Sequence, residues 1–434
     1  MKTRDLLQRL LVDDVLPNHL PDVKYLLKYL SGDSRNTKKV KDPILLTLGE
    51  TWELTPRQLI EALITEHTED HGYQLSMFGL PEFRQSLKRY IEKSERFTCG
   101  DRLEVAVNWT GTRSAMYDYG LYLLDQFKET KNTPYFISTD PGWDYEGVFQ
   151  PLGYQVKYVK LYPDHHFHPL LEEFDRVIQE IKKLPNAYLA FIVINAQHNP
   201  TGNNWNVSIV QEILKLAAKE GCGVLIDNAY YGYTQYEEKT SPLQIVTKTW
   251  NILSSSGVTD LIFATRSLGK QFHCNGWAIG AITATPKTLD ILVNQYRTIH
   301  SYNYHAVYQR AMNQWINSSS MNLFLENQHI EKNKKDEYLF RFLLNEIKIP
   351  ENRFHVGKYA PYLLMEIPHC YHSRSVSHFI RDLFFTTGVL ISSCWALPTK
   401  ITKQTHLPYI RMYTGVPYEK LKEALKRLKA SQLF

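Results

Sequence analysis

Short apolar runs alternate with longer, helix-like segments between residues 110 and 282. The short runs are rich in β-branched and aromatic residues and predict buried strands, whereas the longer segments carry apolar residues at intervals of three and four, which predicts amphipathic helices. The expected strands are residues 134–140, 154–161, 187–195, 223–227, 261–265 and 278–284, and the expected helices are residues 114–127, 169–184 and 206–221. This alternation is typical of a three-layer α/β fold with a mostly parallel sheet.

The two ends of the chain lack this alternation. Residues 1–80 are helix-rich, and a long polar helical segment after residue 284 leads into a mixture of helices and short strands. We therefore expect a large domain of residues 81–315 and a smaller α+β domain built from residues 1–80 and 316–434.

Polar residues follow the expected strands at the points where the strands end. In an open parallel sheet, ligands bind at the carboxyl ends of the strands, where loops and helix N-termini meet. The residues at these ends are 110–112 (TGT), 140–143 (DPGW), 195–202 (NAQHNPTG), 227–230 (DNAY) and 267–270 (SLGK).

Lys270 ends the SLGK motif, between an apolar strand and a second apolar strand that contains glycine. A lysine drawn into the interior loses hydration, which lowers its pKa and favours the neutral, nucleophilic amine. Such an amine is suited to forming a Schiff base. The motif alone also fits a lysine in a surface turn.

Composition and charge exclude several classes of protein. With 43% hydrophobic and 22% charged residues, the 434-residue chain has the composition of a globular protein. Its formal charge of +5 is small and dispersed, so we expect no nucleic-acid partner. The five cysteines have neither CxxC nor Cys/His ligand spacing, which predicts neither a disulfide framework nor a zinc site and favours a reducing compartment.

No apolar run reaches the ~18 residues of a membrane span, so we expect no membrane partner. Leucines recur at helical spacing in residues 1–20, but Asp13 and Asp14 interrupt them and no small-residue cleavage site follows. We therefore expect no signal peptide, and the expected location is the cytoplasm.

Histidines 165, 166 and 168 lie close together in the segment YPDHHFHPLLEEF. They follow an expected strand and have no fixed carboxylate partner in the sequence, so we interpret the segment as a solvated loop and expect no metal site.

Taken together, the strand-end motifs resemble those of the fold-type I pyridoxal-phosphate enzymes, specifically the class I/II aminotransferases. HNPTG (198–202), DxAY (227–230) and SxxK (267–270) occur in the family's order at compatible spacings, and the resemblance spans most of the chain. It implies the PLP-transferase fold type I, pyridoxal 5'-phosphate as the cofactor, and a homodimer with its active site at the subunit interface.

The resemblance implies a role for each strand-end residue. Lys270 would form the Schiff base with the cofactor aldehyde and then move a proton between the substrate Cα and the cofactor. Asp227 would pair with the pyridinium nitrogen, and Trp143 would cover one face of the ring. Asn199 and Tyr230 would bond the phenolic oxygen, so Lys270, Asp227 and Tyr230 are the expected catalytic residues.

The phosphate would lie at the start of the helix that follows TGT. Gly111 and Thr112 would offer backbone N–H groups and a hydroxyl, and Ser267 a second hydroxyl. The family's pattern places an arginine eight residues after the Schiff-base lysine, where this chain has Ala278. Arg113 is our preferred replacement cation, because it follows the phosphate loop, and Arg266 is the weaker candidate.

The substrate side of the site is also implied by the resemblance. Arg411, in PYIRMYTG, would clamp the substrate α-carboxylate, and Asn199 would lie beside it. Gly49 belongs to the segment that closes over the substrate, with Trp52 at the mouth. Tyr73 resembles the tyrosine that reaches the neighbouring subunit's phosphate. It lies one residue farther from residues 79–80 than the usual spacing, so His71 or Gln74 is an alternative.

Each of these residues alone has an ordinary structural explanation. The alternatives are a helix cap at Asp227, core aromatics at Trp143 and Tyr230, a turn at Asn199 and a surface ion pair at Arg411.

The function that the whole set predicts is transfer of an α-amino group from an amino acid to a 2-oxo acid. The same scaffold also supports β/γ-elimination or amino-acid cyclisation. A non-catalytic regulator with an aminotransferase-like sensor domain is a third hypothesis, disfavoured because no helix-turn-helix pattern precedes the motifs.

Overall fold

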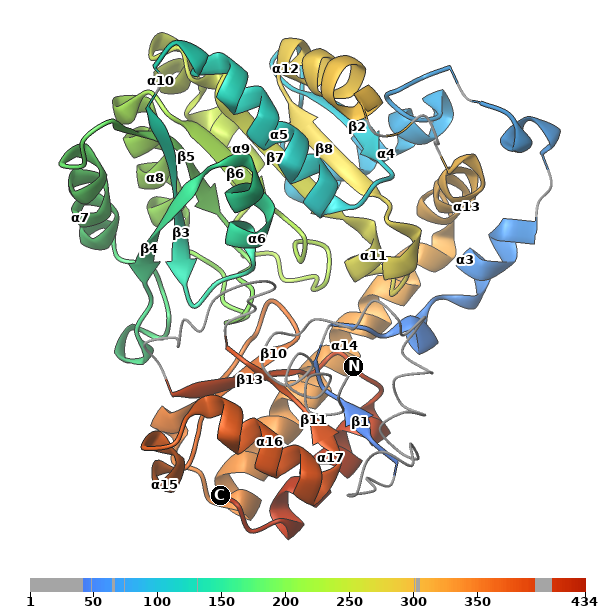
Figure 1. The fold of residues 1–434 in the computed structure, drawn as a ribbon. Coiled ribbons are helices and arrows are strands. Elements are labelled where there is room, and N and C mark those ends of the chain that lie inside the picture. Colours follow the sequence, from blue (N-terminus) through green and yellow to red (C-terminus); the bar gives the residue numbers. More distant parts are fainter. Residues whose placement is uncertain are drawn as a thin grey trace, which may run out of the picture.

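The computed structural model describes residues 42–47, 49–64, 67–73, 75–130, 132–299, 301, 305–394 and 408–434. The expected N-terminal helix and Gln74 therefore lie outside the described residues. Two bodies are visible in Figure 1, a larger one that contains the main sheet and a smaller one that contains the C-terminus.

A seven-stranded sheet forms the centre of the larger body, in the order β2-β8-β7-β6-β5-β3-β4. Strand β8 is antiparallel to both of its neighbours, and the pairs among β7, β6, β5, β3 and β4 are parallel. The strands are β2 (Glu104–Asn108), β3 (Thr133–Asp140), β4 (Gln155–Lys160), β5 (Ala187–Ile194), β6 (Gly223–Asp227), β7 (Ile262–Ser267) and β8 (Gly280–Ala284). The predicted three-layer α/β fold with a mostly parallel sheet is confirmed.

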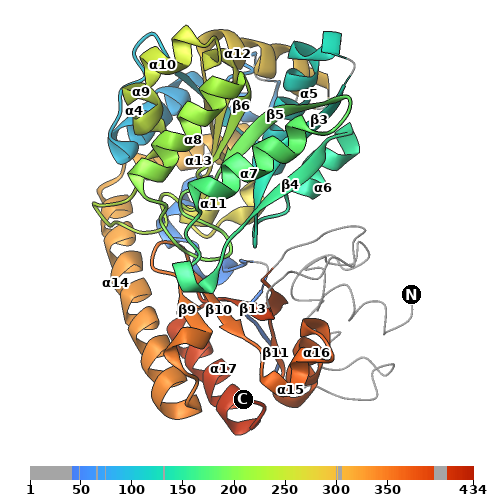
Figure 2. The same cartoon turned by 90° about the vertical axis from the view of Figure 1, so that its left-hand side faces the viewer.

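Helices cover both faces of this sheet (Figures 1 and 2). Helices α5 (Thr112–Gln126), α7 (Leu171–Lys182) and α8 (Val207–Glu220) correspond to the three predicted from the sequence. In α7, Phe174, Val177, Ile178 and Ile181 are buried on one face, as their spacing of three and four requires. Strand β2 was not predicted, because its five residues precede the region of clear strand and helix alternation.

The smaller body contains an antiparallel sheet and a second hydrophobic core. Its sheet has the order β12 (Ser392–Ser393), β13 (Tyr409–Tyr413), β10 (Tyr362–Glu366) and β9 (Phe354–Val356), and α16 (Val376–Thr387) and α17 (Tyr418–Ala430) belong to the same body. Strand β1 (Ile44–Leu45) pairs in parallel with β11 (Val389–Leu390), which joins the two ends of the chain.

Helix α14 (Ser319–Arg341) runs alongside both bodies (Figure 2). Its Met321 belongs to the larger core and its Leu339 to the smaller core. The N-terminal segment also contributes to both, because Ile44 packs in the smaller core and Leu59 in the larger one. The predicted domain boundaries at residues 80 and 315 stay a prediction.

None of the described helices is long and apolar enough to cross a membrane.

Candidate active site

Lys270 lies at the carboxyl end of β7, in the short helix α11 (Leu268–Gln271). Ser267 caps this helix, because its Oγ accepts a hydrogen bond of 3.2 Å from the Lys270 backbone N–H. The ammonium-bearing end of the side chain points to the N-terminal segment, where Nζ donates to the Gly49 carbonyl oxygen at 3.4 Å.

Burial lowers the pKa of Lys270 from its ordinary value. Glu50 opposes this shift through its negative charge, whereas the positive charge of Arg411 adds to it. The amine is therefore closer to neutrality than an exposed lysine, as a nucleophile and proton acceptor requires.

Asp227 ends strand β6 and is 5% exposed. Its Oδ2 accepts a hydrogen bond from the Tyr145 hydroxyl at 2.7 Å, and its Oδ1 accepts one from the Ala229 N–H at 3.0 Å. Burial raises the pKa of the Asp227 carboxyl, and these two bonds oppose the rise. A cationic ligand group beside this carboxylate would offset the cost of burying its charge.

Gly49 lies close to Lys270 and Tyr230, which follow the carboxyl ends of β7 and β6. A Cβ atom at Gly49 would lie 3.2 Å from Lys270 Nζ and 3.3 Å from the Tyr230 hydroxyl, and its φ is +64°. Both the left-handed backbone and the close approach favour glycine here. The Tyr230 hydroxyl shares a hydrogen bond with the Tyr362 hydroxyl, from strand β10 of the smaller body.

Arg411, on strand β13, connects the smaller body to the loop after β5. Its Nε donates to Ser392 Oγ at 3.1 Å, and its NH1 donates to Asn199 Oδ1 at 3.3 Å. Arg411 is 5% exposed, and its guanidinium lies over the Tyr362 ring, 5.4 Å from the ring centroid. These partners fix the orientation of the guanidinium at the site.

Asn195 ties the loop that holds Asn199 to the end of β6. Its Oδ1 accepts from the Asn199 N–H at 2.8 Å, while its Nδ2 donates to the Asp227 carbonyl oxygen at 2.7 Å. The NAQHNPTG and DNAY motifs are therefore held together by a single amide side chain.

The N-terminus of α5 forms a second part of the site. Gly111 has a φ of +81°, and its N–H donates to the Ala278 carbonyl oxygen at 2.9 Å. Because the Gly111 N–H already has a partner, the first backbone N–H group that could bind an anion at this helix start is that of Thr112. Ala278 itself lies beside the loop, since its Cβ is 3.9 Å from the position that a Gly111 Cβ would take.

Arg113 lies next to these donors and is already part of an ion pair. Its NH2 donates to Asp144 Oδ2 at 2.7 Å, and its guanidinium lies over the Trp143 ring, 4.7 Å from the centroid. Burial raises the pKa of Asp144 to about 6 despite the charge of Arg113. Arg113, Trp143 and the α5 N-terminus are thus brought together, as the sequence predicted for a phosphate and ring site.

Arg266 points away from this site. It is 3% exposed and forms a buried ion pair with Glu95, with 3.2 Å between NH1 and Oε1. Successive residues of a strand face opposite sides of the sheet, so Arg266 and Ser267 cannot both face the phosphate loop. The buried ion pair with Glu95 therefore disfavours Arg266 as the replacement for the missing arginine, and Arg113 stays the preferred candidate.

The side chains expected at the mouth are exposed. Trp52 is 62% exposed and Tyr73 is 80% exposed. The alternative His71 is also exposed, in the short helix of residues Thr68–His71.

Several residues of the site have no signal in the sequence motifs. Tyr362 and Ser392 come from strands of the smaller body and meet the site only through the fold. Tyr145 follows Trp143 by two residues, so its proximity to the ring site was predictable, but its bond to Asp227 was not.

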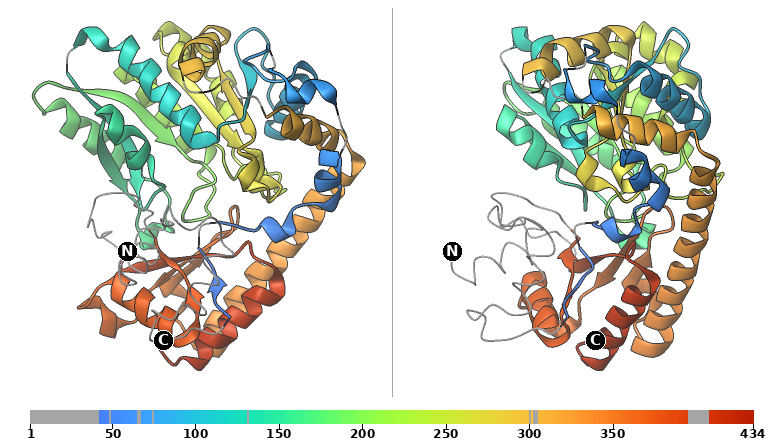
Figure 3. Two further views of the ribbon diagram at one scale, coloured as in Figure 1. Left: turned by 45° about the vertical axis from the view of Figure 1, so that its right-hand side comes forward. Right: turned by 90° about the vertical axis from the view of Figure 1, so that its right-hand side faces the viewer.

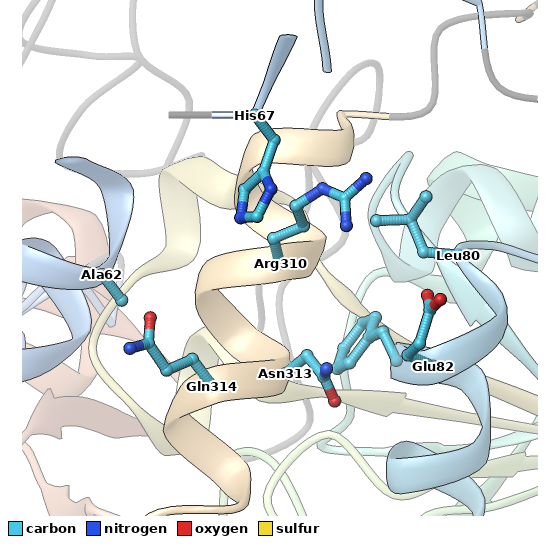
Figure 4. A pocket seen from close by; sticks show the side chains of 8 residues that line it. Ala62, His67, Leu80, Glu82, Arg310, Asn313 and Gln314 are labelled. Atoms are coloured by element: carbon cyan, nitrogen blue, oxygen red, sulfur yellow. The ribbon is translucent and has the colours of Figure 1, made fainter. Parts of the chain in front are cut away.

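Two other features lie outside the site. A hollow of about 380 Å³, shown in Figure 4, lies beside helix α13 (Ala306–Ile316), and none of the expected site residues lines it. Among the described residues, the group whose ligand atoms come within 4.8 Å of one another is Glu366, His369 and His372. Glu366 is already bonded by Arg353 at 2.8 Å, and His372 Nε2 lies 3.1 Å from the Ile367 carbonyl oxygen.

The sequence profile described as "Aminotransferase class I and II" matches residues 41–428. The chain belongs to the class I and II aminotransferase family. Members of this family use pyridoxal phosphate.

Curated aminotransferases of the family are similar to this chain along part or most of its length. An aspartate aminotransferase of Thermotoga maritima is 24% identical over 58% of this chain and 60% of its own length. An LL-diaminopimelate aminotransferase of Dehalococcoides mccartyi is 23% identical over 90% of this chain and 91% of its own length. The chain thus spans about three fifths of the first relative and nearly all of the second.

Similar solved structures establish the fold. An aspartate aminotransferase double mutant of Thermus thermophilus superposes with a TM-score of 0.72 at 19% identity, covering 90% of this chain and 91% of its own. Substrate-bound BacF of Bacillus subtilis superposes with a TM-score of 0.75 at 17% identity, covering 96% and 98%.

The residues of the site fit the cofactor of the aminotransferase family. The aldehyde of pyridoxal phosphate needs an amine that loses its proton easily, and burial supplies one at Lys270. A protonated ring nitrogen suits a buried carboxylate whose described hydrogen-bond donors, Tyr145 and Ala229, are both uncharged. The phosphate suits the donors at the start of α5.

Proposed function

We propose that this chain is a pyridoxal-phosphate-dependent aminotransferase that moves the α-amino group of an amino acid to a 2-oxo acid. The observation that carries this proposal is that the charge of Arg411 acts on the buried Lys270 amine, while Arg411 bonds Asn199 in the loop that Asn195 ties to Asp227. Pyridoxal phosphate supplies the aldehyde that takes up the amino group and the ring that withdraws electrons from the substrate Cα.

Each side chain then has one task. Lys270, kept near neutrality by burial, would accept the proton from the substrate Cα and deliver it to the carbon that carried the cofactor aldehyde, as amino-group transfer requires. Asp227 provides the buried negative charge that keeps the ring nitrogen protonated. Arg411 binds the substrate α-carboxylate through its guanidinium, which Ser392 and Asn199 hold in place.

Further residues would hold the cofactor and limit solvent. The Asn199 amide and the Tyr230 hydroxyl would donate to the phenolic oxygen, and Trp143 would cover the ring. Ser267 retains a hydroxyl proton to donate, because its oxygen accepts the Lys270 N–H. The segment that includes Gly49 excludes water above Lys270.

We propose Thr112 and Arg113 as the donors to the phosphate. The first-turn N–H groups of α5 have no carbonyl partner within the helix, and the Thr112 hydroxyl begins that turn. The Arg113 guanidinium gives one N–H to Asp144 and has further donors on the same plane.

We also propose a homodimer in which Tyr73 reaches the neighbouring subunit's site. Its side chain is 80% exposed, and Ile64 and Leu75 nearby in the sequence are 79% and 97% exposed. Exposed apolar side chains of this kind favour a partner surface. The relatives named above act on aspartate and LL-diaminopimelate by name, and amino and oxo acids are the proposed substrate class here. The location stays the cytoplasm predicted from the sequence.

A panel of amino acids tests the reaction. The purified protein is loaded with pyridoxal phosphate, each amino acid is added, and the cofactor absorbance is followed together with release of the oxo acid. We expect stoichiometric conversion of the cofactor to its amine form, and its return on addition of a 2-oxo acid. Turnover that needs no oxo-acid acceptor would instead support elimination or cyclisation, and a Lys270→Ala variant should show neither.

A further inference from the structure

His273 lies three residues after Lys270 in an unusual backbone conformation. Its φ is +55°, in the left-handed region that a side-chain-bearing residue seldom adopts. The side chain is nevertheless 3% exposed, so it is buried rather than directed into solvent. A strained backbone at a buried position is kept only where the surrounding contacts hold it.

The His273 ring bonds in two directions. Its Nδ1 shares a hydrogen bond with Thr51 Oγ1, and its Nε2 lies 2.8 Å from Gln328 Oε1 on α14. Because Gln328 Nε2 donates to the Tyr233 carbonyl oxygen at 2.9 Å, the amide oxygen of Gln328 is the atom that faces the ring. Burial lowers the pKa of His273 to about 4, so the ring is neutral near pH 7. With its proton on Nε2 facing Gln328, its Nδ1 accepts a hydrogen bond from the Thr51 hydroxyl.

Thr51 belongs to the segment of residues 49–55, which runs alongside α14 (Figure 3). The Gly49 carbonyl oxygen of this segment accepts a hydrogen bond from Lys270 Nζ. Two more bonds tie this segment to the stretch after the lysine. Thr55 Oγ1 donates to the His273 carbonyl oxygen at 2.6 Å, and Asn275 Nδ2 donates to the Gly49 carbonyl oxygen at 3.1 Å. His273 thus contacts the segment through both its ring and its backbone.

A small pocket of about 110 Å³ lies next to the contact between His273 and Gln328. His273, Leu54, Gln328 and Tyr233 are among its lining residues. Packing on this side therefore leaves space unfilled, and the directed bonds of Thr51 and Thr55 connect the segment to His273 beside it.

We propose that His273 is a positioning residue that holds the segment of residues 49–55 closed over Lys270 by fixing Thr51. The proposal rests on the proposed aminotransferase function for its kinetic consequence, but the position of the segment can be measured without any reaction. Closure brings Gly49 to within contact of Lys270 and Tyr230, so release of Thr51 weakens substrate retention more than it changes the proton transfer at Lys270.

His273→Gly is the most direct variant, because glycine adopts a positive φ without strain and the change removes only the ring. Thr51→Val removes the hydroxyl with little change of shape, and Thr51→Ser keeps it. His305→Gly is a matched control, since His305 also has a positive φ of +49° but is exposed and lies at the start of α13.

We expect KM for the amino acid to rise about five-fold in Thr51→Val, as the loss of a buried hydrogen bond implies, and by at least as much in His273→Gly, which also loses the bond to Gln328; kcat should change less than two-fold in both. In the double variant the rise should be smaller than the product of the two single rises, since the Thr51–His273 bond is lost only once. Thr51→Ser and His305→Gly should match the wild type.

Amide hydrogen exchange provides the readout that needs no substrate. Within the segment, the Leu54 N–H donates to the Thr51 carbonyl oxygen at 2.9 Å and the Thr55 N–H to that of Trp52 at 3.2 Å. These amides should exchange about five-fold faster in His273→Gly and in Thr51→Val, but not in the two controls.

Unchanged exchange in residues 49–55 of His273→Gly would overturn the proposal, as would additive effects of the two substitutions on KM. If the wild type does not transaminate any amino acid, the proposed function fails, while the exchange result still decides the role of His273.

Discussion

The Tyr145 hydroxyl donates a hydrogen bond of 2.7 Å to Asp227 Oδ2. Tyr145 begins helix α6 (Tyr145–Phe149), and Asp227 ends strand β6, so the bond joins the ring-stacking region to the buried carboxylate. It stabilises the charged form of Asp227 against burial, which raises the pKa of that carboxyl. The negative charge that the proposed reaction needs thus depends in part on a residue outside the family motifs.

Replacement of Tyr145 by phenylalanine should lower kcat about ten-fold, because a hydrogen bond to a charged group contributes roughly 1.5 kcal/mol or more. The pKa of Asp227 rises further without this donor, and the carboxylate becomes a weaker partner for the ring nitrogen. Steady-state kinetics with the best amino acid of the panel measure the effect. Tyr158→Phe is the control, since its hydroxyl donates to Glu146 at 2.7 Å rather than to Asp227; an equal loss in both variants would contradict the role of Tyr145.

Arg411→Lys should raise KM for amino acids about 30-fold, or roughly 2 kcal/mol, because lysine keeps the charge but loses the paired, planar donors. Ser392→Ala should have a smaller effect of about three-fold, since it removes only the bond that orients Nε. Substrate titrations of both variants test this order. A wild-type KM in the Arg411→Lys variant would show that Arg411 does not bind the α-carboxylate.

Acid should destabilise the protein in part through His198. Burial, with the nearby charge of His168, lowers the pKa of His198 to about 3, and its ring nitrogens lie 2.9 Å from the hydroxyls of Thr139 and Thr201. The folded-state pKa of His198 lies below the ordinary value near 6.5. Between about pH 3 and pH 6.5 the unfolded chain therefore binds more protons than the folded chain. The contribution of neutral His198 to the free energy of unfolding is therefore complete above about pH 6.5, and it is lost as the pH falls toward 3.

Urea unfolding at pH 7.5 and pH 4.5 measures this contribution. We expect the free energy of unfolding to fall between these values, and the fall to be about 2 kcal/mol smaller in His198→Gln, which does not titrate. Only the difference between the two pH values is compared, since the substitution also changes packing. An identical fall in the variant would show that His198 is not the group responsible.

The sequence predicted the parts of this molecule that depend on local pattern. Strand ends in a parallel sheet meet at one edge, so Lys270, Asp227 and Asn199 could be placed near one another from their positions in the chain alone. Tyr362 and Ser392 could not, because they enter from an antiparallel sheet whose position relative to the main sheet is set by packing between the two bodies. The bonds of His273 to Thr51 and Gln328 join residues 222 and 55 positions apart in the chain, and no spacing rule predicts such contacts.

The position of the cofactor phosphate can be tested by removing the arginine at residue 113 and introducing one at residue 278. Ala278 occupies the place of the expected arginine and lies beside Gly111, while Arg113 lies in the first turn of α5 and is paired with Asp144. Arg113→Ala should weaken pyridoxal phosphate binding about ten-fold, because it removes one charge-assisted contact. Ala278→Arg should restore most of that loss in the double variant, since a guanidinium at residue 278 reaches the same anion from the family's usual position.

Cofactor affinity is measured by titrating each apo-protein and following the absorbance of the bound form. Ala278→Gln in the Arg113→Ala background is the control, because it has similar bulk and no charge. Rescue by arginine but not by glutamine identifies the lost interaction as electrostatic. Equal affinities of wild type and Arg113→Ala would show that Arg113 pairs with Asp144 alone. The phosphate would then be held by the α5 N-terminus with Thr112 and Ser267.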